Sequence, residues 1–378
     1  MDFKLGEEHE ALRARIRGVF DAVIDDDVLD ECHRTGTNHS VALATALGDA
    51  GILAQAMPGP GKDPVAMWML SSEAEKYGAP FDAIGMMIMI AGVLDAVGTE
   101  HQKATDAAGL LSGEQAVCFG LTEPGGGSDL PAITTRSRRD GEGWIINGAK
   151  MWTTMGHIAD WVFLLTKTEA EGDGRGGFTV FIVPMSTPGI SVDPIWTMST
   201  ERSNATFYDD VHVGNEWVVG EPEQGWKVLS VMLGFERGMG NTGALTPLLR
   251  RFADWARSTG AIDDPLIRER MAQVAIDAQI SELLTQRTVW TAATGQAPGT
   301  EGSIAKVFAT EAYQHHARWA QAAAAPDSLL GLDAPGAAAG GWIDHDVRHS
   351  TPQTLQGGTS EINRNNIAER FLGLPRAR

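Results

Sequence analysis

The stretch Cys118-Phe-Gly-Leu-Thr-Glu-Pro-Gly-Gly-Gly-Ser-Asp-Leu130 separates two kinds of sequence in this chain of 378 residues. Helical periodicity precedes it, and short β-rich runs divided by turn-forming residues follow it. Its three consecutive glycines free the backbone and remove side-chain bulk, so a flat or phosphorylated ligand can approach the main chain. Thr122 and Ser128 bracket the glycines with hydroxyl groups. Because a plain connection between two domains can have the same composition, this stretch alone does not decide the function.

The residues before this stretch predict a helical domain over residues 1–117. Apolar side chains recur every four positions from Leu12 to Ile24, which places them on one face of a helix. Proline and glycine then separate further helical patterns, as in Met57-Pro-Gly-Pro-Gly61. We expect helices at residues 7–24, 40–54, 63–77, 81–97 and 100–112.

The residues after it predict a small antiparallel β barrel or sandwich over residues 118–220. Turn-forming pairs such as Asn147-Gly148 separate the candidate strands. These strands are expected at residues 132–138, 143–146, 161–168, 177–184 and 206–213. No glycine-rich turn follows a strand and opens a helix here, so a nicotinamide-binding βαβ fold is not predicted.

Helical periodicity returns after Trp226 and continues to the end of the chain. It predicts a C-terminal four-helix bundle over residues 221–378, with helices at residues 226–258, 264–294, 302–325 and 360–372. The chain is therefore expected to be an α+β protein of several domains, in the order helical, β, helical.

The composition argues against several classes of function. The formal net charge is -19, whereas binding to nucleic acids or to anionic membranes requires a basic face. Cys32 and Cys118 are the two cysteines and lie far apart, and the histidines have no ligand spacing, so neither a disulfide framework nor a metal site is predicted. Neither a signal-peptide pattern nor an apolar segment long enough to span a bilayer is found. We expect a soluble, cytoplasmic protein.

Two further segments carry residues suited to a planar, phosphorylated cofactor. Lys150-Met-Trp-Thr-Thr154 offers an indole face and two hydroxyl groups. Gln356-Gly-Gly-Thr-Ser-Glu-Ile362 places a glycine pair before a helix that Thr359 or Ser360 can cap, with Glu361 near the positive end of that helix. Each segment also has an ordinary explanation, since tryptophans pack in cores and Ser/Thr/Glu patterns cap many helices.

In this order and at these positions, the three segments resemble the acyl-CoA dehydrogenase family. The resemblance covers essentially the whole chain, from the opening Met1-Asp-Phe-Lys-Leu-Gly-Glu-Glu8 to the closing Asn363-Arg-Asn-Asn-Ile-Ala-Glu-Arg-Phe-Leu-Gly-Leu-Pro-Arg376. It implies bound FAD, α,β-dehydrogenation of an acyl-CoA thioester to the 2-enoyl-CoA, and delivery of electrons to an electron-transfer flavoprotein.

The resemblance also implies two groups of cofactor-binding residues. The isoalloxazine end of FAD would be bound by Phe119, Leu121, Thr122, Gly127, Ser128, Trp152 and Thr154. Among these, Trp152 would cover the flavin and Thr154 would hydrogen-bond near its reactive N5. Ser128 would lie where FAD and the CoA arm of the substrate converge. The diphosphate–ribose region would be held from the C-terminal domain by Thr359 and Glu361.

The position of the catalytic base departs from the commonest family pattern. In many members the base is a glutamate directly before Gly-Thr-Ser-Glu, but here that position is Gly357. A second family solution places the glutamate on the first long helix of the C-terminal domain, which matches Glu236. We therefore expect Glu236 to be the base, the alternative being a charged pair with Arg237 on a solvated helix face. Arg237 would either orient Glu236 or lie near the CoA phosphates.

Two segments that are usual in homotetrameric members are missing. An Arg-x-x-Phe-Gly and a Gln-x-x-Gly-Gly-x-Gly segment would contact the adenine–diphosphate end of FAD, but the corresponding regions 257–265 and 329–341 contain neither. Either other residues such as Arg268 or Arg270 bind the diphosphate, or a different chain supplies the contacts. This departure resembles the actinobacterial steroid-degrading branch, which forms α2β2 heterotetramers and would use CoA thioesters of sterol side chains or ring fragments. The alternatives are a non-catalytic or FAD-sharing partner subunit and an acyl-CoA oxidase on the same fold.

Overall fold

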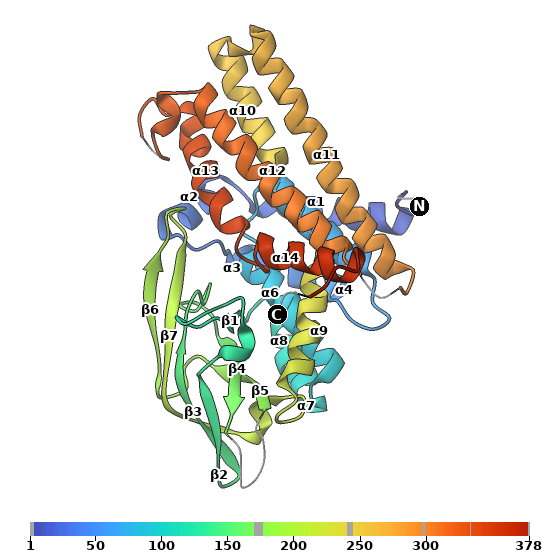
Figure 1. Ribbon diagram of the computed structural model, residues 1–378, viewed down its shortest axis with the longest axis vertical. Helices are drawn as coiled ribbons and strands as arrows, with labels where there is room; N and C mark the ends of the chain where they lie inside the picture. Colours follow the sequence, from blue (N-terminus) through green and yellow to red (C-terminus); the bar gives the residue numbers. More distant parts are fainter. Residues whose placement is uncertain (1–3, 170–176, 240–244, 297–298, 333, 377–378) are drawn as a thin grey trace. The chain divides into compact units, whose positions relative to one another are not determined.

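The computed structural model describes residues 4–169, 177–239, 245–296, 299–332 and 334–376 (Figure 1). Its internal contacts group into two compact units. The mixed unit contains residues 8–67 and 80–236, and the helical unit contains residues 1–7, 68–79 and 237–378. Among the described residues, no helix combines the length and the apolar character that crossing a bilayer requires.

The N-terminal region is helical, as predicted. Its α-helices are α1 Glu7–Val23, α2 Asp26–Thr35, α3 Val41–Asp49, α4 Ile52–Ala56, α5 Pro64–Tyr77, α6 Asp82–Val97, α7 Glu100–Gln102 and α8 Ala108–Leu111. The predicted stripe on α1 is confirmed, because Leu12, Ile16 and Phe20 are buried. The single helix expected at residues 40–54 is divided instead, since Gly51 adopts a left-handed φ of 68° between α3 and α4.

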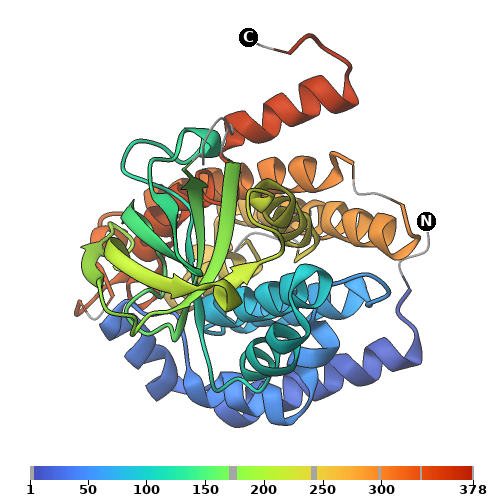
Figure 2. The ribbon, with the colours of Figure 1, turned by 90° about the horizontal axis from the view of Figure 1, so that it is seen from below.

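Helix α6 is the buried centre of the mixed unit. Every residue from Ala83 to Leu94 is buried, which explains why this segment is apolar on all sides and lacks an amphipathic pattern. It packs against β1, and Figure 2 shows the strands curving across one side of the helices of this unit.

Eight strands form one sheet within the described residues. They are β1 Val117–Gly120, β2 Arg136–Asp140, β3 Gly143–Lys150, β4 Trp161–Thr168, β5 Gly177–Pro184, β6 Ile190–Trp196, β7 Arg202–Gly214 and β8 Val218–Val219. The order is β6-β7-β3-β2-β4-β5-β8, with β1 paired to β4. The sheet is mainly antiparallel, as predicted, but β1 and β2 pair with β4 in parallel, so it is a mixed sheet. β1 pairs with the first half of β4, and β2 pairs with the end of β4. The glycine-rich loop lies in the segment that connects β1 to β2.

The C-terminal region is helical, which confirms the predicted order of helical, β and helical parts. Its α-helices are α9 Gly225–Met239, α10 Leu245–Thr259, α11 Pro265–Ala293, α12 Glu301–Ala323, α13 Trp342–Gln353 and α14 Ser360–Asn366. In the helical unit α11 and α12 lie side by side, and α13 packs on α12 (Figure 1). Their shared core includes Phe252, Tyr313 and Ile343. The single helix expected at residues 226–258 is observed as α9 and α10, and residues 240–244 lie outside the described part.

Candidate functional site

The glycine-rich segment forms a tight loop after β1. Glu123 and Gly126 exchange two backbone hydrogen bonds, at 3.3 Å from the Glu123 N–H and at 3.0 Å from the Gly126 N–H. Gly127 lies so close to Thr122 that a Cβ at residue 127 would be 3.0 Å from the Thr122 Cγ2 atom. Residues 124–129, which include Ser128, are exposed. The loop therefore offers bare backbone to a ligand, as the glycines predict.

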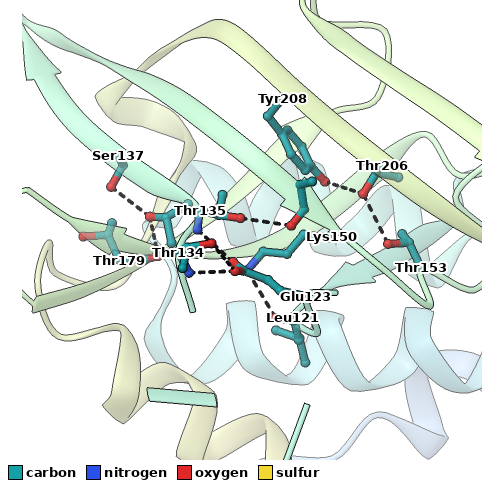
Figure 3. Close-up of polar contacts among 12 residues, drawn as sticks. Leu121, Glu123, Thr134, Thr135, Ser137, Lys150, Thr153, Thr179, Thr206 and Tyr208 are labelled. Atoms are coloured by element: carbon teal, nitrogen blue, oxygen red, sulfur yellow. Dashed lines mark hydrogen bonds and ion pairs between the residues drawn. The ribbon is translucent and has the colours of Figure 1, made fainter. Parts of the chain in front are cut away.

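A buried ion pair fixes the base of this loop (Figure 3). Lys150, the last residue of β3, donates from Nζ to the Glu123 carboxylate at 3.0 Å and to the Leu121 carbonyl at 3.2 Å. The exposed fraction is 0% for Lys150 and 6% for Glu123. The carboxylate also accepts hydrogen bonds from the backbone N–H groups of Thr134 and Thr135, at 2.6 and 2.8 Å, and from the Thr134 hydroxyl. The hydrogen bonds from these donors offset the free-energy cost of removing the carboxylate from water.

Both members of the pair are charged at neutral pH. Burial raises the pKa of Glu123, but the hydrogen bonds from Thr135 and Thr134 outweigh burial and lower that pKa to about 2. Burial lowers the pKa of Lys150 to about 8, against the attraction of the Glu123 carboxylate. A carboxylate that is already saturated with donors cannot readily accept a substrate proton. The pair therefore holds the loop in place and is not a catalytic base.

The second predicted segment leaves β3 directly after Lys150. The Met151 N–H donates to the Thr122 carbonyl at 2.8 Å, so the two segments lie side by side. Trp152 has a left-handed backbone with φ 60°, and 52% of the residue is exposed. The Thr154 N–H closes a tight turn onto the Trp152 carbonyl at 2.9 Å. An indole left half uncovered gains burial when a planar ring stacks on it, so these residues fit an isoalloxazine ring.

The structure thus brings together the predicted residues of the flavin end. Phe119 lies on β1, with its ring edge-on to that of Phe163 at 6.3 Å between centroids. The remaining predicted residues of this group, Leu121, Thr122, Gly127, Ser128, Trp152 and Thr154, lie in the two adjacent segments. Their contacts with a cofactor stay a prediction.

The predicted base lies on α9 in the same unit. Gly225, the first residue of this helix, is pressed against β5, because a Cβ at residue 225 would be 2.7 Å from the Phe178 carbonyl oxygen. The rings of Trp226 and Phe178 also meet, at 6.1 Å between centroids. Glu236 is half-buried near the other end of α9. The next residue, Arg237, belongs to the described helix, but its side chain lies outside the described part.

The third predicted segment belongs to the helical unit. Thr359 is the N-cap of α14, because its hydroxyl accepts a hydrogen bond from the Ile362 N–H at 3.2 Å. Of the two predicted caps, the structure therefore selects Thr359. Gly357 and Gly358 have left-handed φ values of 63° and 82°, which accounts for the glycine pair. Lys306 of α12 donates to the Gly358 carbonyl at 2.6 Å and holds the turn against that helix.

Several charged residues of the helical unit are candidates for binding the diphosphate end of FAD. Glu361 is exposed, and its own backbone N–H and the Thr359 hydroxyl lower the pKa of its carboxyl group. Arg268 donates to the carbonyls of Ile262 and Asp263 at 3.0 and 2.9 Å and so caps the turn before α11. Arg270 is exposed. Both explanations for the missing diphosphate contacts, other residues of this chain or a second chain, therefore stay open.

Sequence reasoning did not identify Glu123 and Lys150 as residues of the site. Both lie within the segments quoted for the resemblance, one acidic and one basic. Their opposite charges could have predicted the ion pair, because the two segments that contain them were expected to meet at one cofactor. Asn204, which donates to the Thr153 carbonyl at 2.9 Å, gave no such signal, because it lies in a strand far along the chain.

Comparison with known proteins identifies the family. Residues 6–114, 118–211 and 223–372 match the models of the N-terminal, middle and C-terminal domains of acyl-CoA dehydrogenases. The acyl-CoA dehydrogenase IpdE1 of Mycobacterium tuberculosis is 32% identical, over 76% of this chain and 74% of its own length. The solved Tcur3481-Tcur3483 steroid ACAD is 29% identical with a TM-score of 0.89, and the ChsE4-ChsE5 complex from M. tuberculosis is 30% identical with a TM-score of 0.88, each covering 100% of both chains. The chain therefore belongs to the acyl-CoA dehydrogenase family and is an FAD-dependent acyl-CoA dehydrogenase.

Proposed function

We propose that this protein dehydrogenates a bulky CoA thioester, that of a steroid side chain or ring fragment, with Glu236 as the catalytic base. The observation that carries this proposal is the joining of the Thr122 loop to the Trp152 turn through the buried Glu123–Lys150 pair. This arrangement presents glycine backbone beside a half-exposed indole, as a flavin ring requires. The steroid substrate class is supported by the likeness to the Tcur3481-Tcur3483 steroid ACAD.

The reaction breaks two C–H bonds of the thioester and forms the α,β double bond. Bound FAD supplies the acceptor for the hydride that leaves the β-carbon. A carboxylate must take the proton from the α-carbon, and Gly357 has no side chain to do so. Glu236 is a half-buried carboxylate on α9, in the same unit as the Thr122 loop and the Trp152 turn. The resulting enoyl thioester is conjugated and leaves without further bond changes.

Substitution of the base tests this assignment. Glu236→Gln is expected to lower kcat by roughly 10²- to 10⁴-fold, the usual contribution of a general base, with the FAD content unchanged. Glu236→Asp keeps a carboxylate and should retain part of the activity. Glu221→Gln changes an exposed glutamate just before α9 and serves as the matched control. Near-normal turnover by FAD-loaded Glu236→Gln would exclude this residue as the base.

We propose further that the protein works in a heterotetramer of α2β2 type and passes its electrons to an electron-transfer flavoprotein. Two observations support a second chain. This chain is similar to the solved ChsE4-ChsE5 complex, and its regions 257–265 and 329–341 lack the two segments that usually contact the FAD diphosphate. A diphosphate without charge-assisted partners would lose much of its binding energy, so a second chain that supplies them would restore FAD affinity.

Expression with and without a second acyl-CoA dehydrogenase-like chain tests the heteromer. Alone, the chain is expected to lose FAD on size-exclusion chromatography, and with the correct partner to retain it in a heteromeric peak. Polycyclic CoA thioesters should then be oxidised faster than butyryl-CoA when the electron-transfer flavoprotein is the acceptor. A stable homotetramer that is fully loaded with FAD would contradict the heteromer while leaving the dehydrogenase activity intact.

A further inference from the structure

The Trp152 turn has a backbone that needs support. In the antiparallel pairing of β3 with β7, Lys150 faces Thr206, so a regular continuation would place Trp152 opposite Asn204. Instead the Thr153 N–H donates to the Asn204 carbonyl at 2.9 Å, and Trp152 is an extra residue with a left-handed φ of 60°. This geometry is that of a β-bulge, which re-aims a side chain. A bulky residue in the left-handed region is strained unless its neighbours hold it there.

Asn204 holds this bulge from both sides. Besides accepting the Thr153 N–H through its backbone carbonyl, Asn204 donates from Nδ2 to the Thr153 carbonyl at 2.9 Å. Asn204 and Thr153 are both 0% exposed, so neither of these bonds competes with water. One residue of β7 therefore satisfies both backbone groups of the residue that follows Trp152.

The orientation of the Asn204 amide is itself determined. Its Oδ1 accepts from Arg202 Nε at 3.1 Å, and the second proton of Nδ2 points to His157 Nδ1 at 3.2 Å. Burial and then the positive charge of Arg202 lower the pKa of His157 to about 4, so the imidazole is neutral and Nδ1 can accept. The other ring nitrogen then donates to the Thr37 hydroxyl at 2.8 Å.

The hydroxyl of Thr153 is also bound to β7. It contacts the Thr206 hydroxyl at 3.2 Å, which in turn contacts the buried Tyr208 hydroxyl at 3.2 Å (Figure 3). Three residues at every second position of the strand lie on the same face, namely Asn204, Thr206 and Tyr208. The main chain and the side chain of Thr153 are therefore both fixed to a single rigid element.

We infer that Asn204 is a positioning residue that sets the Trp152 indole and the Thr154 backbone against the flavin. This inference rests on the proposed placement of the flavin at this turn. Asn204 acts through Thr153 and not by touching cofactor or substrate. Its amide must donate two hydrogen bonds, to the Thr153 carbonyl and to His157, and accept one from Arg202. An aspartate of the same shape cannot donate both, so the turn should relax to a common backbone conformation.

Asn204→Asp in the full chain, co-purified with its partner chain and loaded with FAD, tests the inference. Kcat for a polycyclic CoA thioester is expected to fall roughly 10- to 100-fold, the effect of a displacement of about 1 Å, with little change in KM. Flavin fluorescence should rise, because the quenching indole moves away. Thr166→Val removes a hydroxyl that is equally buried in the same sheet but donates to Ser137 and the Thr179 carbonyl, and is the matched control for lost stability. It should leave kcat and fluorescence close to those of the unsubstituted protein.

Trp152→Phe separates this inference from the proposed function. Fluorescence that changes in Trp152→Phe but not in folded, FAD-loaded Asn204→Asp overturns the role of Asn204 and leaves the flavin assignment intact. Fluorescence that changes in neither variant overturns both. If Asn204→Asp does not fold, His157→Phe decides, since it removes the acceptor of the second amide proton, together with the bond to Thr37, and leaves the Asn204 amide itself in place. That variant should show a smaller rise in fluorescence and a smaller fall in kcat, and unaltered values would overturn the role of Asn204.

Discussion

Lys150 ends β3 without any exposed surface, and the Glu123 carboxylate balances its charge. The two residues do not depend on each other equally. The carboxylate keeps three hydrogen bonds from Thr134 and Thr135 if the lysine is removed. The ammonium group would keep the Leu121 carbonyl if the glutamate is removed. An uncompensated buried charge is the more costly of the two defects.

We therefore predict that Glu123→Gln destabilises the protein more than Lys150→Met. The loss in unfolding free energy should be about 3–5 kcal/mol for Glu123→Gln, the range for breaking a buried ion pair, because the neutral amide cannot balance the lysine and its NH2 group would face the donors of Thr134 and Thr135. For Lys150→Met the loss should be about 1–3 kcal/mol, because the Glu123 carboxylate loses one donor and keeps three. Urea denaturation followed by circular dichroism measures both. A larger loss in Lys150→Met would show that the hydrogen bonds from residues 134 and 135 do not support the carboxylate.

The same pair predicts how stability depends on pH. The pKa of Glu123 falls from its usual 4.5 to about 2 in the folded protein, so its stabilisation is present above pH 4.5 and is lost as the pH falls toward 2. The pKa of Lys150 falls from 10.5 to about 8, so the cost of its buried charge is relieved as the pH rises from 8 to 10.5. Unfolding free energies measured across both windows should show the acid loss in the unsubstituted protein and a weaker one in Glu123→Gln. Equal acid losses would contradict the assignment.

For single residues, the sequence predicts which residue type a local backbone conformation needs better than it predicts which side chains contact each other. The glycines at residues 125–127 and the N-cap at Thr359 follow from local backbone needs, and local needs can be read from neighbouring residues. The contact between Glu123 and Lys150 joins residues 27 apart, and that between Asn204 and Thr153 joins residues 51 apart. Such pairings depend on strand register, which one sequence does not reveal.

Among the elements, helices α10, α12 and α13 of the helical unit are joined by one buried acid. The Oδ1 atom of Asp346 accepts hydrogen bonds from Arg251 of α10 at 3.1 Å and from the Tyr313 hydroxyl of α12 at 2.8 Å. Arg251 also lies over the Trp342 ring at 3.9 Å. Burial raises the pKa of Asp346, against the attraction of Arg251.

Arg251→Leu is predicted to destabilise this unit by about 3–5 kcal/mol at neutral pH, because it leaves Asp346 charged and buried. Asp346→Asn should cost less, since the amide oxygen can still accept from Arg251 and Tyr313. A pKa raised by folding means that the folded state gains stability as the pH falls, so the defect of Arg251→Leu should shrink on acidification. Hydrogen exchange of the α13 amides reports this unit separately. Equal protection in the two variants, or a defect that does not vary with pH, would contradict the predicted role of the acid.

Helices and strands whose apolar residues recur at regular spacing could be predicted from the sequence. Elements made mostly of polar residues could not. Strands β4 and β5 are found at the predicted residues, as is α1 to within one residue. Helix α2 has no buried residue and so gives no apolar pattern. Helix α13 was not predicted either, because it is rich in polar residues and has Pro352 inside it. Strand β1 has four residues and is too short to show an alternation.

For the whole molecule, the order of three individually weak segments decides the family. Each segment has an ordinary local explanation, but the three domain models together match residues 6–114, 118–211 and 223–372. The substrate and the partner could not be predicted in the same way, because they depend on surfaces whose shape comes from many residues. The predicted partner chain therefore rests on two missing segments and on the likeness to the ChsE4-ChsE5 complex.

Anaerobic mixing of the FAD-loaded protein, co-purified with the proposed partner chain, with a polycyclic CoA thioester is the most direct test of flavin-dependent acyl-CoA oxidation. The flavin absorbance should be bleached within a single turnover, and the enoyl-CoA should appear in equal amount. Glu236→Gln should bind the same thioester with its flavin remaining oxidised, because the α-proton is not removed. Absence of bleaching with every CoA thioester, or equal bleaching in Glu236→Gln, would contradict the account.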